Sequence, residues 1–173
     1  MNAPRVVTKR HAGEGRWPTI PPVCLSVLAS NATRRYHRSV DCTFCKILEG
    51  LFPSWRVYED DNSVAFLDKG QVTRGHTLVV PRRHAEDIWA LSEDEARAVM
   101  RSVHRVARVL REKLGLLGLN VTQANGKAAW QDVSHYHVHL IPRYGDDGFR
   151  PPWRSTSPSQ EQLSDVQQQL LQK

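Results

Sequence analysis

The chain has 173 residues, of which 40% are hydrophobic and 24% charged, with a formal net charge of +6. This length and composition suit one globular domain with a core of its own. No stretch approaches the run of about 18 apolar residues that a membrane-spanning helix needs. The positive charge belongs to residues 1–40, which carry seven Lys and Arg side chains against one Glu, whereas the rest of the chain is balanced. We therefore expect no specific nucleic-acid partner and no membrane association.

Residues 1–40 are predicted to form a basic, mostly disordered extension, because four prolines interrupt them and no periodicity is sustained. An apolar run at 23–30 is similar to a weak signal-peptide core, but two prolines directly precede it and argue against that interpretation. Three cysteines with a single CxxC pair do not resemble a secreted disulfide framework. They favour a reducing, cytoplasmic compartment, with Cys24 as an incidental thiol.

The pattern of secondary structure sharpens from residue 41. A helical turn is expected at 45–50, and β-strands are expected at 55–59, 63–67, 76–80, 120–124 and 135–142. Ser92 and Glu95 form a capping box that opens a long amphipathic helix, and Gly115 ends it.

Strands arranged around one long helix predict an α+β fold with an antiparallel sheet of about five strands and a short N-terminal helix. The predicted domain covers residues 41–150. Residues 151–173 are expected to form a C-terminal loop and a weak, Gln-rich helix.

Three histidines alternate along the last predicted strand, at His135, His137 and His139. Side chains alternate across a strand, so the three imidazoles share one face while Tyr136, Val138 and Leu140 face the core. The row has two chemical interpretations. It either binds one metal ion as an open catalytic site, or it attacks and binds a phosphate. The spacing along a straight strand suits a phosphate better than a metal ion.

The segment HYHVHLI at 135–141 resembles the His-φ-His-φ-His-φ-φ pattern of the histidine-triad (HIT) family of nucleotide hydrolases and transferases. Residues 42–47 look like the opening of its zinc-containing bacterial members, and residues 64–68 look like its nucleoside-binding strand. Residues 75–84 resemble the strand and turn that follow, while Asn125–Gly126 and Gln131 match its phosphate loop. The resemblance covers about residues 41–150 and implies the histidine-triad fold and a homodimer.

The resemblance also implies roles for the site residues. His137 is expected to be the nucleophile that forms a nucleotidyl-imidazole intermediate. His139 and His76 are expected to contact the α-phosphate and the leaving group, and Gln131 to donate to the α-phosphate. Neutral imidazole is a competent nucleophile near pH 7, because its pKa is about 6.5.

The nucleotide-binding residues follow from the same resemblance. Asp68 is expected to accept hydrogen bonds from the ribose hydroxyls, and Phe44 and Phe66 to form apolar walls around a purine base. Asn125 is expected to contact the phosphate or to support the residues that do.

A second site is expected at Cys42, Cys45, His84 and His135, which match the ligand positions of the zinc-containing members. Two thiolates and two imidazoles make a closed tetrahedral site, so a structural zinc ion is predicted. The same residues are also compatible with free thiols beside surface histidines, or with a redox CxxC pair, for which no thioredoxin-like context is visible.

Two residues depart from the family pattern. Trp130 stands where a small residue, often Gly, is usual, and it either narrows the phosphate loop or turns outward. Asp132 stands where Ser is often found, although a carboxylate beside a phosphate is electrostatically costly. Asp132 is expected either to donate a proton to the leaving group or to pair with Arg143.

The sequence thus predicts a hydrolase or transferase that attacks the α-phosphate of a nucleoside phosphoramidate or adenylate through a nucleotidyl-histidine. A rival enzyme activity is that of a diadenosine polyphosphate hydrolase or phosphorylase. The sequence is also compatible with a zinc-stabilised nucleotide-binding protein without turnover, and with a metallohydrolase that uses the triad as ligands.

Overall fold

The computed structural model of this chain describes residues 41–150 and 155–172. The predicted extension at residues 1–40, including Cys24, lies outside the described residues, so its properties stay predictions. In the described ranges, no helix is long and apolar enough to cross a membrane.

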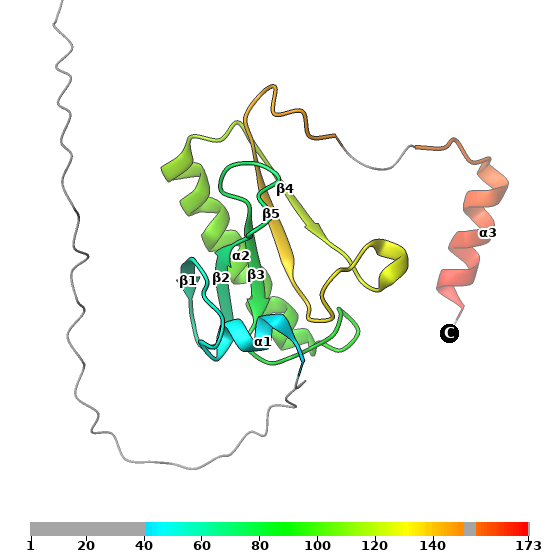
Figure 1. The fold of residues 1–173 in the computed structure, drawn as a ribbon. Coiled ribbons are helices and arrows are strands. Elements are labelled where there is room, and N and C mark those ends of the chain that lie inside the picture. Colours follow the sequence, from blue (N-terminus) through cyan, green and yellow to red (C-terminus); the bar gives the residue numbers. More distant parts are fainter. Residues whose placement is uncertain (1–40, 151–154, 173) are drawn as a thin grey trace, which may run out of the picture. The chain divides into compact units, whose positions relative to one another are not determined.

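Five strands form one antiparallel sheet in the order β1-β2-β3-β5-β4 (Figure 1). The strands are β1 (Arg56–Glu59), β2 (Ser63–Leu67), β3 (Thr77–Pro81), β4 (Gly118–Gln123) and β5 (Val138–Arg143). The helices are α1 (Thr43–Leu48), α2 (Glu93–Leu114) and α3 (Gln160–Leu171), with a 3-10 turn at Lys127–Ala129. These elements confirm the predicted fold class of an antiparallel sheet with one long helix.

Helix α2 begins and ends where the sequence predicts. The Ser92 side chain accepts a hydrogen bond from the Glu95 amide, and the Glu95 carboxylate accepts one from the Ser92 amide. Gly115 follows the helix in the left-handed conformation, with φ of 62°. This conformation favours glycine, because a Cβ atom would crowd the backbone there.

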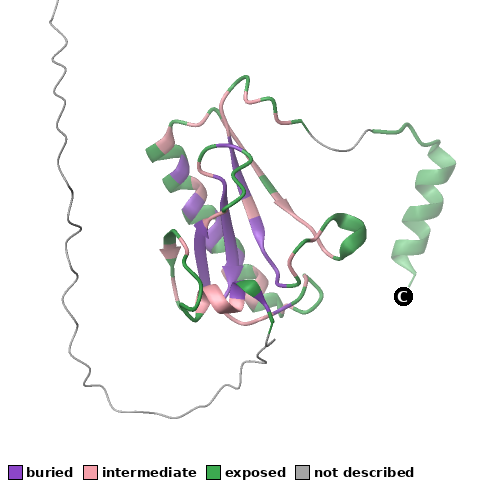
Figure 2. Cartoon of the chain, viewed as in Figure 1, coloured by how far each residue is buried: buried purple, intermediate pink, exposed green. Residues whose placement is uncertain are grey.

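Alternation along the strands gives the sheet two apolar faces. Helix α2 covers one face, where its buried side chains contact Ala65, Val79, Val138 and Leu140. Phe44 of α1 packs on the other face, against Val64, Phe66, Leu78 and Val80. Burial is concentrated in these central strands (Figure 2). His139 lies between Val138 and Leu140 in β5, so its side chain belongs to the α1 face.

The last strand begins later than predicted, which is a correction. It starts at Val138, whereas the sequence pattern predicts a strand from His135. The Tyr136 amide donates to Ala85 O at 2.6 Å, and the His135 amide donates to Val133 O at 2.8 Å. Because these backbone bonds go to loops, the chain joins the ladder only at Val138. The other predicted elements agree with the structure to within two residues.

Candidate active site and metal centre

His76, His137 and His139 come together on the α1 face of the sheet. His76 directly precedes β3, His137 directly precedes β5, and His139 lies within β5. The ring centroids of His137 and His139 are 4.9 Å apart, and those of His76 and His139 are 5.1 Å apart. His137 and His76 are each only 2% exposed. The structure therefore assembles three of the predicted catalytic residues.

Hydrogen bonds fix the orientation of the His137 ring. His137 Nδ1 lies 2.7 Å from the carbonyl oxygen of His135, which can only accept, so Nδ1 carries the proton. In the neutral ring, Nε2 then holds the lone pair. This is the tautomer that a histidine nucleophile needs.

The other two imidazoles form a hydrogen-bonded pair. His76 Nε2 lies 2.9 Å from His139 Nδ1, while His76 Nδ1 lies 3.3 Å from Gly70 O and 3.5 Å from Asp68 Oδ2. The Val72 amide also approaches His76 Nδ1, at 3.5 Å, but the two oxygens accept and outweigh this long contact, so His76 Nδ1 carries a proton and His76 Nε2 accepts one from His139. Burial lowers the pKa of both rings, to about 4 for His139, and keeps them neutral at pH 7.

Gln71 is a positioning residue that the sequence analysis missed. Its side chain accepts from the Gly75 and His76 amides and donates to the Asp68 and His76 carbonyl oxygens. These hydrogen bonds hold the loop that carries His76 against the end of β2. A single sequence offers no signal for this role, because a Gln in a loop is ordinary.

A cleft of about 500 Å³ lies between α1 and β2, within the range of about 300–1,000 Å³ typical of small-ligand sites. Phe44, Phe66 and Asp68 line it, as the family resemblance implies for a nucleoside. The Phe44 ring lies 5.6 Å from that of Phe66 and 5.2 Å from that of His137, between centroids. A larger, apolar hollow of about 590 Å³ lies between β1 and α2. No histidine lines either space, but Phe44 of the smaller cleft contacts the His137 ring, so the smaller cleft is the better candidate for a nucleotide site.

The predicted phosphate-loop residues are engaged with backbone. Gln131 donates to the carbonyl oxygens of Glu86 at 2.6 Å and Val133 at 3.0 Å, and it accepts from the Gly126 amide. Asn125 accepts from the Ile88 amide at 2.8 Å. Both side chains thus hold the loop in place, and no described contact joins either of them to the triad.

The two departures from the family pattern behave differently. The Trp130 side chain turns outward and is 71% exposed, so the indole does not narrow the loop. The Asp132 carboxylate faces the triad, with Oδ1 3.5 Å from His137 Nε2. It does not pair with Arg143, whose guanidinium binds Asp147 and Asn120 instead. The expected pairing of Asp132 with Arg143 is therefore wrong.

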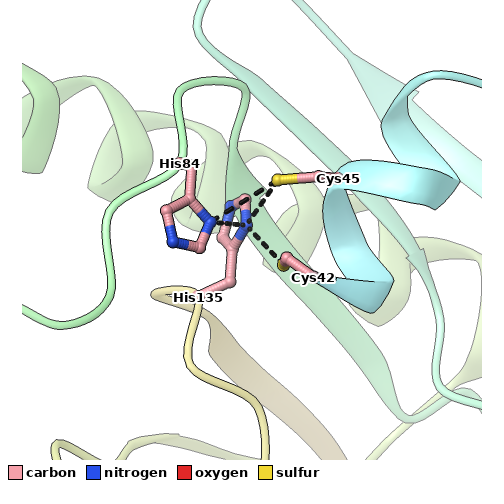
Figure 3. Close-up of side chains that lie close together, drawn as sticks. All are labelled: Cys42, Cys45, His84 and His135. Atoms are coloured by element: carbon pink, nitrogen blue, oxygen red, sulfur yellow. Dashed lines mark hydrogen bonds between the residues drawn. The ribbon is translucent and has the colours of Figure 1, made fainter. Parts of the chain in front are cut away.

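Cys42, Cys45, His84 and His135 converge from three parts of the chain, at α1, after β3 and before β5 (Figure 3). His135 Nδ1 lies 3.4 Å from Cys42 Sγ, 3.6 Å from Cys45 Sγ and 3.3 Å from His84 Nδ1, and Cys45 Sγ lies 3.5 Å from His84 Nδ1. Tetrahedral zinc with Zn–S of about 2.3 Å and Zn–N of about 2.05 Å gives edges of about 3.5 Å and 3.3 Å. The four ligand atoms therefore fit a zinc ion.

The surroundings of His135 favour its neutral, metal-binding form, whereas those of Cys45 oppose a thiolate unless a cation is present. His135 is fully buried, and its Nε2 donates to Pro81 O at 3.0 Å, so Nδ1 keeps its lone pair toward the thiols. Burial lowers the pKa of His135 to about 4. Burial and the neighbouring Cys42 raise the pKa of Cys45 to about 12, so two thiolates here need a compensating cation.

A metal ion in the triad itself is less well supported. Asp68, His76 and His139 lie close enough for a cation, but His137 is not part of this group. The 2.9 Å between His76 and His139 nitrogens is a hydrogen-bond distance, shorter than the edge of about 3.3 Å on a shared zinc ion. This geometry favours phosphate chemistry over a metallohydrolase.

The comparisons with known proteins agree with this arrangement. The family model of the HIT domain matches residues 50–146. "Protein hit" of Bacillus subtilis is 45% identical over 120 residues, which are 69% of this chain and 83% of that protein. The adenosine 5'-monophosphoramidase hnt1 of Schizosaccharomyces pombe is 33% identical over 135 residues, covering 78% of this chain and 98% of that protein.

A solved structure supplies a parallel for the fold and for zinc binding. A zinc-bound histidine triad family protein from Mycobacterium smegmatis superposes with a TM-score of 0.62 and 36% identity, covering 77% of this chain and 97% of that one. The fold therefore has a counterpart of known structure that binds zinc.

Proposed function

The chain belongs to the HIT-domain family, and from that premise we propose that it is a hydrolase or transferase of nucleoside 5'-phosphoryl compounds that works through a covalent nucleotidyl-His137 intermediate. The proposed substrates are phosphoramidates or adenylates of a purine nucleoside, with adenosine as the first choice. The observation that carries the proposal is the His137 ring, which is buried and held through Nδ1, so that the lone pair of the neutral ring lies on Nε2.

In the proposed reaction, Asp68 binds the ribose and Phe44 and Phe66 enclose the base. His137 Nε2 forms a bond to the α-phosphorus while the bond from that phosphorus to the leaving group breaks and the leaving group departs with the electron pair. Water then hydrolyses the N–P bond and releases the nucleoside monophosphate and a free His137. His76 and His139 contact the phosphate and the leaving group, while Gln131 and Asn125 shape the phosphate loop. Positioning and charge stabilisation supply most of the catalysis in such reactions, and the covalent intermediate divides one difficult displacement into two easier ones.

A structural zinc ion bound by Cys42, Cys45, His84 and His135 is part of the proposal. When bound, it supplies a rigid cross-link and no reaction chemistry, because four protein ligands close the site. The carbonyl oxygen of His135 accepts from His137 Nδ1, so the ligand set also positions the nucleophile. A homodimer in the cytoplasm remains our expectation.

Mass spectrometry after incubation with adenosine 5'-phosphoramidate tests the proposal directly. We expect an adduct of one AMP on His137, which disappears as AMP is released. His137→Ala should lower kcat by at least about a thousandfold, because it removes the nucleophile.

His104→Ala is the matched control, since His104 is exposed on α2 and should leave turnover unchanged. AMP binding without any adduct or turnover would mean a nucleotide-binding protein rather than an enzyme. Turnover that depends on inorganic phosphate would identify a phosphorylase instead.

A further inference from the structure

Asp132 has no part in the reaction described above, although its carboxylate lies against the attacking atom. Oδ1 is 3.5 Å from His137 Nε2. The preceding residue is fixed at three points, because the Gln131 side chain binds the Gly126 amide and the carbonyl oxygens of Glu86 and Val133. The side chain of Asp132 is 77% exposed, but its backbone cannot move far from the triad.

The contact places two hydrogen-bond acceptors together. His137 Nε2 holds a lone pair when the ring is neutral, and a carboxylate only accepts. A phosphorus atom placed for attack lies about 3–3.5 Å from its nucleophile. Groups bonded to that phosphorus therefore come within reach of the Asp132 carboxylate, which disfavours anions and favours cations or donors.

Positive side chains do not offset this charge. Among residues 41–150 and 155–172, no Lys or Arg forms a hydrogen bond or ion pair with Asp132, whose ion-pair contact is His137. Lys69 lines the nucleotide cleft beside Asp68. The carboxylates that reach the rings of the triad are Asp68, from the side of His76, and Asp132, from the side of His137. A leaving group that carries several negative charges meets repulsion here, whereas a protonated amine meets attraction.

We propose that Asp132 is a specificity-determining residue that selects substrates with an amine leaving group and rejects those with a polyphosphate leaving group. This inference rests on the proposed function. A phosphoramidate takes a proton from solvent on its P–N nitrogen, and Asp132 stabilises that cationic nitrogen. The His137 lone pair then forms the N–P bond, while the electrons of the P–N bond pass to the departing neutral amine. Water displaces His137 and releases the nucleoside monophosphate and a proton.

Asp132→Asn in the full chain tests this selectivity, because it removes the charge and keeps the shape. We expect kcat/KM for adenosine 5'-phosphoramidate to fall about tenfold and kcat/KM for diadenosine tetraphosphate to rise about tenfold. Raising the salt concentration should weaken the discrimination of the wild-type protein, because the carboxylate is exposed, and should leave that of the variant unchanged. Asp61→Asn, in the turn between β1 and β2, makes the same change in net charge and should leave kcat/KM for both substrates unchanged.

A binding measurement separates this inference from the proposed function. Asp132→Asn should raise the affinity for AMP about tenfold and leave the affinity for uncharged adenosine unchanged. Equal changes for both substrates, or an unchanged AMP affinity, would overturn the role of Asp132. If the wild-type protein forms no nucleotidyl-histidine and turns over neither substrate, the proposed function fails, and the AMP comparison alone decides whether Asp132 repels anions.

Discussion

Trp130 is the residue whose backbone most clearly conflicts with its side chain. It follows the 3-10 turn at Lys127–Ala129 with φ of 64° and is the one non-glycine residue with positive φ in the described part of the chain. Its amide donates to Lys127 O at 3.0 Å, which closes the turn and holds this conformation. A Cβ atom in the left-handed region costs about 1–2 kcal/mol, which explains why the family pattern often has Gly at this position. The indole gains little in return, because it is 71% exposed.

Replacing Trp130 with Gly should therefore stabilise the protein by about 1 kcal/mol, since relief of backbone strain outweighs the added freedom of the unfolded chain. Urea unfolding at pH 7 measures the difference. Trp130→Ala is the matched control, because it removes the indole and keeps the Cβ atom, and it should give no gain. An equal gain from both variants would assign the cost to the indole and contradict the conformational explanation.

At the N-terminus of α2, the side chain of Glu95 makes two separate stabilising interactions. Glu95 completes the capping box with Ser92, and it also forms an ion pair with Arg83 through both carboxylate oxygens. Arg83 in turn donates to the carbonyl oxygens of His84 and Ala90. The first turn of α2 is thereby joined to the loop that follows β3 and carries the predicted zinc ligand His84.

This arrangement predicts how stability depends on pH. The hydrogen bonds from Arg83, followed by those from Ser92, lower the pKa of Glu95 from 4.5 to about 2. Because the folded-state pKa is the lower one, the stabilisation is complete above about pH 4.5 and is lost as the pH falls toward 2. Glu95→Gln should cost about 1 kcal/mol at pH 7, after allowing for solvent screening at this partly exposed pair, and nothing near pH 2. Thermal unfolding between pH 2 and 7 measures the two curves.

Glu93→Gln is the control for that measurement. Glu93 also lies in the first turn of α2, so its loss changes the helix dipole interaction similarly, but its ion pair with Arg97 joins two largely exposed side chains. Its stability curve should stay nearly parallel to that of the wild-type protein. A Glu95→Gln curve parallel to the wild type would contradict the assigned ion pair.

The elements also show what a sequence can and cannot predict. The capping box of α2 and the glycine that ends it depend on neighbouring residues, so the sequence contains them in full. The β-branched run of β3 likewise predicts a strand, and the structure buries every residue of β3. The start of β5 could not be predicted, because it depends on the bond from Tyr136 to Ala85, which is distant in sequence. The loop closed by Gln71 and the approach of Asp132 to His137 join residues only three to five positions apart, and they escaped prediction because a Gln or Asp in a loop does not indicate which partner it contacts.

In the domain as a whole, the four predicted zinc ligands bring together segments that are far apart in the sequence. Cys42 and His135 are 93 positions apart, and Cys45 and His84 are 39 apart. A cross-link over such separations removes conformations mainly from the unfolded chain. The same ligands border the nucleophile, because the His135 carbonyl accepts from His137 Nδ1 and Phe44 packs against both rings. Stability and catalysis are thus expected to depend on the same cluster.

Cys42→Ser should therefore remove the bound zinc and lower Tm by about 10 °C or more, because a lost ligand leaves the remaining thiolate and imidazoles without their cation. Metal analysis of the purified protein and thermal unfolding with and without a chelator provide the measurements, and the chelator should lower Tm of the wild type but not of the variant. Cys24→Ser makes the same chemical change outside the predicted ligand set and should retain one zinc per chain.

Turnover by Cys42→Ser below its Tm should fall as well, since the His135 carbonyl that orients His137 loses its anchor. If Cys42→Ser retains its zinc, the metal is bound elsewhere in the protein. If the histidine triad is then found to bind that zinc, both the predicted structural site and the role of His137 as nucleophile are contradicted.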